Sequence, residues 1–268
     1  MIRGLYTAAS GMNAEELRQD VIADNLANVS TTGFKKDEAV FQAFPDQMIQ
    51  RIHDRMDEAA SKQASAFGSQ ATVPLGKLGQ GVMPDATVTN FSDGSVIRTD
   101  RPLDLALHGN ALFTVQRGDG SMAYTRAGNF TINTDKDLVT EAGELVMSTG
   151  GQPINVDGAQ VNVSVNGQVL VDGKDAGQLQ LAAYDPAHMQ KIGGGLYERK
   201  EDALEGLGDE PTVDTRVQQG MLEQANVQVV QEMVSMISVM RSYEANSKTI
   251  QMQDQSLNTL ISEVGRPS

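Results

Sequence analysis

The 268-residue sequence contains no cysteine and no tryptophan, and aromatic residues make up only 4% of it. The absence of cysteine excludes disulfide bonds, thiolate nucleophiles and cysteine-ligated zinc sites. Because aromatic side chains are scarce, any hydrophobic core must be built from aliphatic residues and the 13 methionines. The length allows one large domain or two smaller ones, at roughly 100–200 residues per domain.

Positive charge is also scarce, with 21 lysines and arginines against 35 aspartates and glutamates, a net charge of −14. Nucleic acids and anionic membranes are bound through clustered Lys and Arg, so we expect neither as a partner. No apolar run approaches the roughly 18 residues that suggest a membrane span, so we expect no membrane insertion. The N-terminus also lacks the pattern of a cleavable signal, and any export would follow another route.

Sequence patterns of catalysis and metal binding are missing as well. There is no metalloprotease, nucleophile-elbow or P-loop motif, so we expect no enzyme activity, no catalytic residue, no cofactor and no metal. The nearest approach to a metal motif is the EF-hand-like spacing of Asn133, Asp135, Asp137 and Glu144. Its sixth position is Leu138 instead of glycine, which favours a solvated hairpin turn over a calcium site.

The period of the hydropathy pattern changes along the chain, which predicts an α+β protein. N- and C-terminal helices are expected to form a coiled-coil-like assembly domain, and an extended connector joins them to an all-β central domain. The expected segments are residues 1–45 (N-terminal assembly helix and motif), 46–95 (connector, with a possible short helix over 46–62), 96–198 (all-β domain), 199–214 (linker) and 215–268 (C-terminal heptad helix).

The region 96–198 has the period of two that is typical of β-strands. Valines alternate with polar residues on both sides of Asn166-Gly167, which is the strongest short-range signal for a β-hairpin. Further strands are expected over Leu103–Leu107, Leu112–Val115, Met122–Thr125, Phe130–Ile132, Leu145–Met147 and Leu179–Tyr184.

The C-terminal region has an apolar residue at every seventh position and neither Gly nor Pro from 221 to 264, which predicts one helix of about 64 Å. These positions include Leu222, Val229, Met236, Tyr243, Ile250 and Leu257. Met233 and Met240 occupy the partner positions four residues after Val229 and Met236. So long a helix needs another beside it, and the N-terminal helix, with Leu5, Met12 and Leu26, is the candidate.

The N-terminal helix is expected to stop at Ser30–Gly33, where the glycine can adopt a positive φ. Asn25 and Asn28 lie one helical turn apart beside this stop. Two roles remain open for them, capping of the helix C-terminus or an amide contact between subunits. Phe34 is expected to dock where the helix meets the connector.

Several segments resemble the family of bacterial flagellar basal-body rod proteins, of the FlgG and FlgF types. The motif Asn25–Lys35 resembles the family's N-terminal signature, and Gln219–Val227 with Arg241–Asn246 resembles the entry to its C-terminal helix. Pro102–Leu107 and Tyr124–Phe130 are similar to its β-domain motifs. The resemblance extends in the family's order from about residue 2 to residue 262.

The resemblance implies a structural subunit of the rod that polymerises helically into a rigid, torque-transmitting tube. Its implied partners are other copies of itself, other rod and hook proteins, and the flagellar type III export apparatus. Its implied location is the flagellar basal body outside the cytoplasmic membrane, reached without a cleavable signal. The rod position, proximal or distal, stays open, and the alternatives are a hook or hook-adjacent axial protein or a soluble coiled-coil adaptor unrelated to the flagellum.

Overall fold

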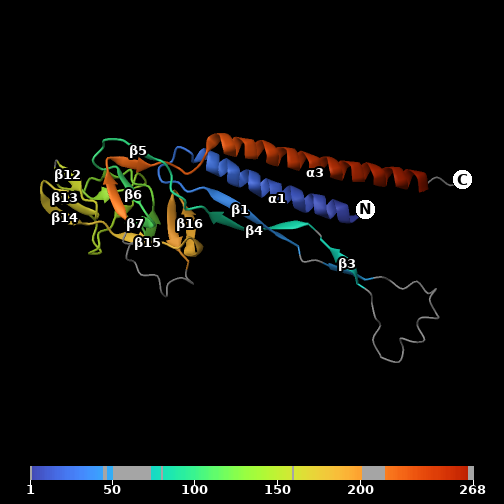
Figure 1. Cartoon of the computed structure of the whole chain (residues 1–268), viewed down its shortest axis with the longest axis horizontal. Coiled ribbons are helices and arrows are strands. Elements are labelled where there is room, and N and C mark those ends of the chain that lie inside the picture. Colours follow the sequence, from blue (N-terminus) through green and yellow to red (C-terminus); the bar gives the residue numbers. More distant parts are fainter. Residues whose placement is uncertain are drawn as a thin grey trace, which may run out of the picture. The chain divides into compact units, whose positions relative to one another are not determined.

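The structure is a computed structural model that describes residues 2–44, 47–50, 74–79, 81–158, 160–200 and 215–264. The chain divides into two compact units. Unit 1 comprises Met1–Asp20, Ala39–Thr87 and Met236–Ser268, and unit 2 comprises Val21–Glu38 and Val88–Ser235. The two long helices, with strands in each unit, confirm the predicted α+β class (Figure 1).

Helix α1 (Ile2–Ala27) ends close to the predicted stop, and Gly33 has a φ of +66°. Strand β1 (Asp37–Ala43) follows and pairs with β4 (Val82–Thr89) in a two-stranded ribbon. In unit 1 the guanidinium of Arg18 on α1 lies 5.6 Å from the centre of the Phe41 ring on β1. This contact joins the first part of α1 to the ribbon.

The short helix expected over 46–62 is not formed at its start. Residues Gln47–Gln50 form β2, which pairs antiparallel with β3 (Pro74–Leu78). A helix is thereby excluded at these four residues, because their backbone groups bond across to the second strand. The remainder of the expected helix lies outside the described residues.

Helix α3 spans Val229–Val264, so the predicted start at residue 221 was wrong. Met221–Glu223 instead form β19, which pairs antiparallel with β5 (Val96–Arg98), and Leu222 therefore belongs to a strand. Over a single seven-residue repeat, one apolar residue is compatible with a strand as well as with a helix. Here the pairing with β5, which is distant in the sequence, makes this segment a strand.

Within unit 1, α1 and α3 contact each other through small residues of α1. A Cβ added at Gly4 would collide with the Gln253 side chain, and one added at Gly11 would meet Asn246. Gly11 lies seven residues after Gly4, whereas its partner Asn246 lies seven residues before Gln253. The two helices therefore run antiparallel. Val239, seven residues before Asn246, is 4% exposed. We call this contact the glycine seam.

Unit 2 is built on an antiparallel sheet with the order β16-β17-β8-β7-β11-β10-β9, to which β15 is added on β7. The strands are β7 (Ala111–Gln116), β8 (Met122–Thr125), β9 (Thr131–Ile132), β10 (Leu138–Val139), β11 (Leu145–Val146), β15 (Leu181–Ala183), β16 (Met189–Gly193) and β17 (Leu196–Arg199). Its core is aliphatic around the edge-to-face pair Phe113 and Phe130. The six short strands expected from the sequence all lie at or next to observed ones.

Besides the β5–β19 pair, the described part of unit 2 holds two further small sheets and a 3₁₀ turn, Pro186–His188. The Asn166-Gly167 hairpin is confirmed, since β12 (Val161–Val163) pairs with β13 (Gln168–Val171), which also pairs with β14 (Lys174–Gln178). Strand β6 (Leu105–His108) pairs with β18 (Arg216–Gln219). Residues 133–137 form the predicted hairpin turn between β9 and β10, with the Asn133 side chain accepting two backbone N–H bonds.

Replacing Gly11 with leucine tests the glycine seam. Leucine favours an isolated helix by about 1 kcal/mol relative to glycine, but at this position it would collide with Asn246. We expect faster amide hydrogen exchange over residues 243–253 of the variant, measured by mass spectrometry on the full chain. Asn13→Leu, at an exposed position of the same helix, is the control, and slowed exchange in Gly11→Leu would contradict the seam.

Candidate functional site

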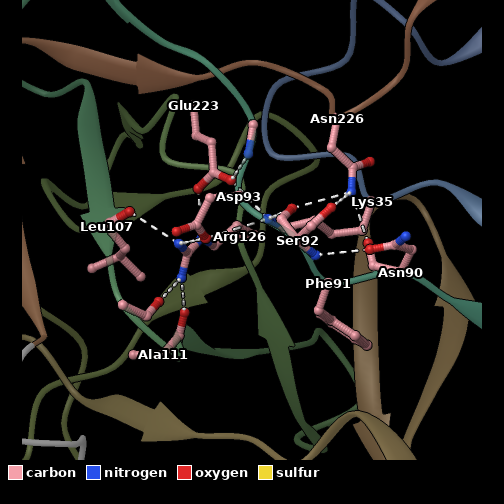
Figure 2. Close-up of polar contacts among 12 residues, drawn as sticks. Lys35, Asn90, Phe91, Ser92, Asp93, Leu107, Ala111, Arg126, Glu223 and Asn226 are labelled. Atoms are coloured by element: carbon pink, nitrogen blue, oxygen red, sulfur yellow. Dashed lines mark hydrogen bonds and ion pairs between the residues drawn. The ribbon is translucent and has the colours of Figure 1, made fainter.

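Charged side chains from distant parts of the sequence meet inside unit 2. Lys35 lies between α1 and β1, Arg126 directly follows β8, and Glu223 is the last residue of β19. Their side chains are 1%, 0% and 2% exposed. Asp93, between β4 and β5, is half exposed and joins them (Figure 2). We call these four residues the charge cluster.

Glu223 is the centre of the charge cluster, because two cations share its carboxylate. Its Oε1 accepts hydrogen bonds from Lys35 Nζ at 2.7 Å and from the Gly94 backbone N–H at 2.9 Å. Its Oε2 accepts a bond from Arg126 Nε at 2.6 Å. Asp93 Oδ1, 3.2 Å from Arg126 Nη2, supplies the second negative charge, so the cluster as a whole is neutral.

The other donors of Arg126 hold the turn that connects β6 to β7. Nη2 donates to the Leu107 carbonyl oxygen at 3.0 Å, and Nη1 donates to the Gly109 carbonyl at 2.8 Å and to the Ala111 carbonyl (Figure 2). A guanidinium has five N–H donors in one rigid plane, and here it holds three backbone carbonyl groups of the turn in fixed positions. The ion pair and the backbone of the turn are therefore fixed together.

Amide and backbone contacts extend the charge cluster to the loops beside it. Lys35 Nζ also donates to the Ser92 carbonyl at 2.8 Å. Asn226 Nδ2 donates to the Asn90 carbonyl at 2.8 Å, and Asn226 Oδ1 accepts from the Lys36 backbone N–H at 2.8 Å. The loop after α1, the loop after β4 and the segment after β19 are thus tied to one another.

Gly33 lets the chain pass close to Arg126. The Gly33 backbone N–H donates to the Glu223 carbonyl oxygen at 2.8 Å. A Cβ at this position would stand 2.5 Å from the Arg126 carbonyl carbon, and the φ of +66° itself favours glycine. Both facts require glycine here.

An aromatic group, Phe91, Tyr184 and Tyr197, lies beside the charge cluster. The ring of Phe91 is 4.7 Å from that of Tyr184 and 5.1 Å from that of Tyr197. Burial raises the pKa of both tyrosines above the ordinary value for the phenol. The three rings form a buried apolar contact next to the loop that carries Ser92 and Asp93.

Burial and ion pairing shift the pKa values of Lys35 and Glu223 in opposite directions. Burial lowers the pKa of Lys35 and the positive charge of Arg126 lowers it further, so the hydrogen bond and the charge of Glu223 offset only part of the effect. Burial would raise the pKa of Glu223, but the charges of Arg126 and Lys35 outweigh it and hold that pKa below its ordinary value. Glu223 is therefore an ionised carboxylate at neutral pH.

The structure gives Asn25 and Asn28 separate roles within one chain. Asn25 is buried, its Nδ2 donating to the Asp37 carbonyl and its Oδ1 accepting from the Asp37 N–H, both at 2.8 Å. Asn28 Nδ2 donates to the Asp24 carbonyl at 2.9 Å, which caps the last turn of α1. Phe34 is buried beneath Lys191 of β16, whose Nζ lies 3.8 Å from the ring centre.

The predicted helix residues differ in exposure. Leu5, Met12, Leu26, Met236, Ile250 and Leu257 are partly buried, whereas Val229, Met233, Met240 and Tyr243 are exposed. Val239 is buried where the pattern pointed to Met240, which is 49% exposed. The buried stripe of α3 thus continues three residues after Met236, at Val239.

Lys35, Arg126 and Glu223 were not predicted as site residues. Each of them nonetheless stands in one of the separate family motifs named above, and that position is the signal that could have pointed to them. The described residues hold no group of three or more His, Asp or Glu arranged for a metal ion. In the same part of the chain, no helix combines the length and the apolar character needed to cross a membrane.

Comparison with known proteins finds these motifs in the same places. The model "Flagella basal body rod protein" matches residues 5–35, "Flagellar hook protein FlgE/F/G D1 domain" matches 106–171, and "Flagellar basal body rod FlgEFG protein C-terminal" matches 218–263. The flagellar basal-body rod protein FlgG of Borreliella burgdorferi is 34% identical over 96% of this chain and 97% of its own length. This chain belongs to the flagellar basal-body rod protein family.

Two further relatives show how evenly the similarity extends. The FlgG of Caulobacter vibrioides is 36% identical over 96% of this chain and 97% of its own. The flagellar hook-basal body complex protein FlhO of Bacillus subtilis is 32% identical over 99% and 100%. The three matched regions of this rod-family chain include Lys35, Arg126 and Glu223, one residue in each.

Replacing Glu223 with glutamine should destabilise unit 2 by about 3–5 kcal/mol, because two buried cations lose their shared carboxylate. Urea unfolding followed by circular dichroism at pH 7 measures the change. Glu198→Gln on β17, an exposed position, is the matched control and should alter stability by less than about 0.5 kcal/mol. Equal stability of the two variants would contradict the central role of Glu223.

The pH dependence follows from the lowered pKa of Glu223. Its stabilising effect is complete above the ordinary pKa of 4.5 and is lost as the pH falls through the lower pKa of the folded state. The difference in unfolding free energy between the native chain and Glu223→Gln should therefore shrink as the pH is lowered from neutral through 4.5 and below it. A difference that stays constant over this range would show that the carboxylate charge is not the stabilising element.

Proposed function

We propose that this chain is a structural subunit of the flagellar basal-body rod and that it polymerises helically through its long helices into a rigid, torque-transmitting tube. The family and the similarity over nearly the full length support the rod subunit. The observation that supports polymerisation is an apolar face of α3 that the chain itself leaves exposed.

The exposed face lies on the first three turns of α3. It consists of Val230, Met233, Val234, Ile237 and Met240, which are 77%, 49%, 62%, 51% and 49% exposed. Spacings of three and four residues place them on one side of a helix. We call them the outer stripe. Burying a side chain of this kind contributes about 1.5–3 kcal/mol, so covering several at once favours association.

The occupant we propose for the outer stripe is a helix of another copy of this chain or of a neighbouring rod or hook protein. Methionine suits such a contact, because its flexible thioether adapts to non-identical neighbours. The interface residues predicted on α1 and α3 divide accordingly, with the exposed ones facing neighbours and the partly buried ones supporting the helix pair. Such repeated helix contacts along a polymer supply the stiffness that a rotating shaft requires.

In the resemblance described above, FlgG is the distal type of rod protein and FlgF the proximal type, so the relatives named FlgG support the distal type for this chain. The flagellar basal body, outside the cytoplasmic membrane, is the corresponding location. Export without a cleavable signal through the flagellar type III apparatus is the proposed route. A coiled-coil adaptor unrelated to the flagellum is not favoured, since the similarity covers both ends and the β domain together.

Ile237→Asp tests polymerisation, because it places a charge in the middle of the outer stripe. We expect the purified variant to remain monomeric in sedimentation velocity at concentrations where the native chain forms growing assemblies, and to fail to restore swimming in cells that lack the native protein. Gln231→Asp, an exposed polar position in the preceding turns, is the control and should behave as native. A native chain that forms only a dimer would support the adaptor instead.

A further inference from the structure

Unit 2 takes essential parts from near both ends of the chain. Strand β6 is buried from Leu105 to Leu107, and its ladder partner is β18, which pairs Gln219 with Leu105 and Arg216 with His108. Val217 of β18 is 2% exposed and belongs to the same core as the residues of β7 and β8. The early strands therefore have a gap in their core until β18 has docked.

The charge cluster has the same dependence. Arg126 is fully buried and holds the β6–β7 turn, yet among the described residues the only fully buried carboxylate that it contacts is that of Glu223 on β19. Without Glu223, the buried Lys35 and Arg126 have only the half-exposed Asp93 to balance them. Burying an unpaired cation is strongly unfavourable, so the arrangement around Arg126 is not stable before Glu223 arrives.

We propose that residues 216–226 act as a completion latch, meaning that the β6–β8 core of unit 2 closes only when this segment docks. Chains are synthesised from the N-terminus, and whole domains fold as units. Lys35 and Arg126 are synthesised early, whereas residues 216–226 are synthesised only after most of the chain. Unit 2 accordingly stays open until everything except α3 has emerged. This inference goes beyond the proposed function and does not depend on polymerisation.

The completion latch predicts a specific effect on the folding rate, which a measurement of equilibrium stability alone would not reveal. If the segment docks in the step that closes the core, weakening its contacts slows folding. If it docks afterwards, weakening its contacts speeds unfolding and leaves the folding rate unchanged. Two different contacts can be weakened independently, the carboxylate of Glu223 and the packing of Val217.

The experiment is refolding of the full chain from urea, with pulsed hydrogen exchange read by mass spectrometry. We expect amides of residues 105–125 and 216–223 to become protected in the same kinetic phase. In Glu223→Gln we expect that phase to be about tenfold slower, and in Val217→Ala, which keeps every charge, we expect it to be slowed severalfold. Glu198→Gln should refold at the native rate.

Two results would overturn the latch. One is protection of residues 105–125 in a phase that precedes protection of 216–223 in the native chain. The other is a native folding rate with faster unfolding in both Glu223→Gln and Val217→Ala. If Glu223→Gln does not refold at all, Val217→Ala and the native chain still decide between the two orders of events. If the native chain stays monomeric but refolds with the expected phases, the completion latch is supported and the proposed polymerisation is contradicted.

Discussion

One buried carboxylate between two buried cations organises the second unit of this protein. Removing Lys35, Arg126 and Glu223 from water is costly, and the arrangement is stable because each charge has a charged or backbone partner. Besides one another, the partners that satisfy them come from the loop between β4 and β5 and from the β6–β7 turn, while Lys35 itself follows α1 and Glu223 ends β19. Their geometry therefore fixes where the N- and C-terminal parts of unit 2 meet the sheet.

Much of the fold could be predicted from local sequence patterns. The Asn166-Gly167 turn identifies its hairpin because glycine readily adopts the positive φ found at Gly167, and the helix stop before Gly33 has the same origin. The strand status of Leu222 could not be predicted in this way. Its pairing partner, Ile97, lies far away in the sequence, and an apolar residue at a heptad position fits a strand equally well.

The site was harder to predict than the fold. From the sequence, Asn25 could cap the helix or make an amide contact between subunits, and only the structure places Asp37 opposite its amide with both hydrogen bonds made. The stripe of α3 continues through Val239, which is 4% exposed, and not through Met240, which is 49% exposed, and spacings of three and of four residues both fit a helical pattern. In the charge cluster, the sequence around each charged residue does not indicate which distant residue it pairs with. Only the folded structure shows these pairs.

The neutrality of the charge cluster has a consequence for how the protein responds to its ionic surroundings. The chain as a whole carries −14, but two positive and two negative groups cancel within the cluster. Dissolved salt screens exposed charges strongly and buried pairs only weakly. Ionic strength will therefore change how strongly neighbouring acidic molecules repel each other while leaving the interior of unit 2 almost untouched, so the same solution variable can control packing between molecules without loosening any one of them.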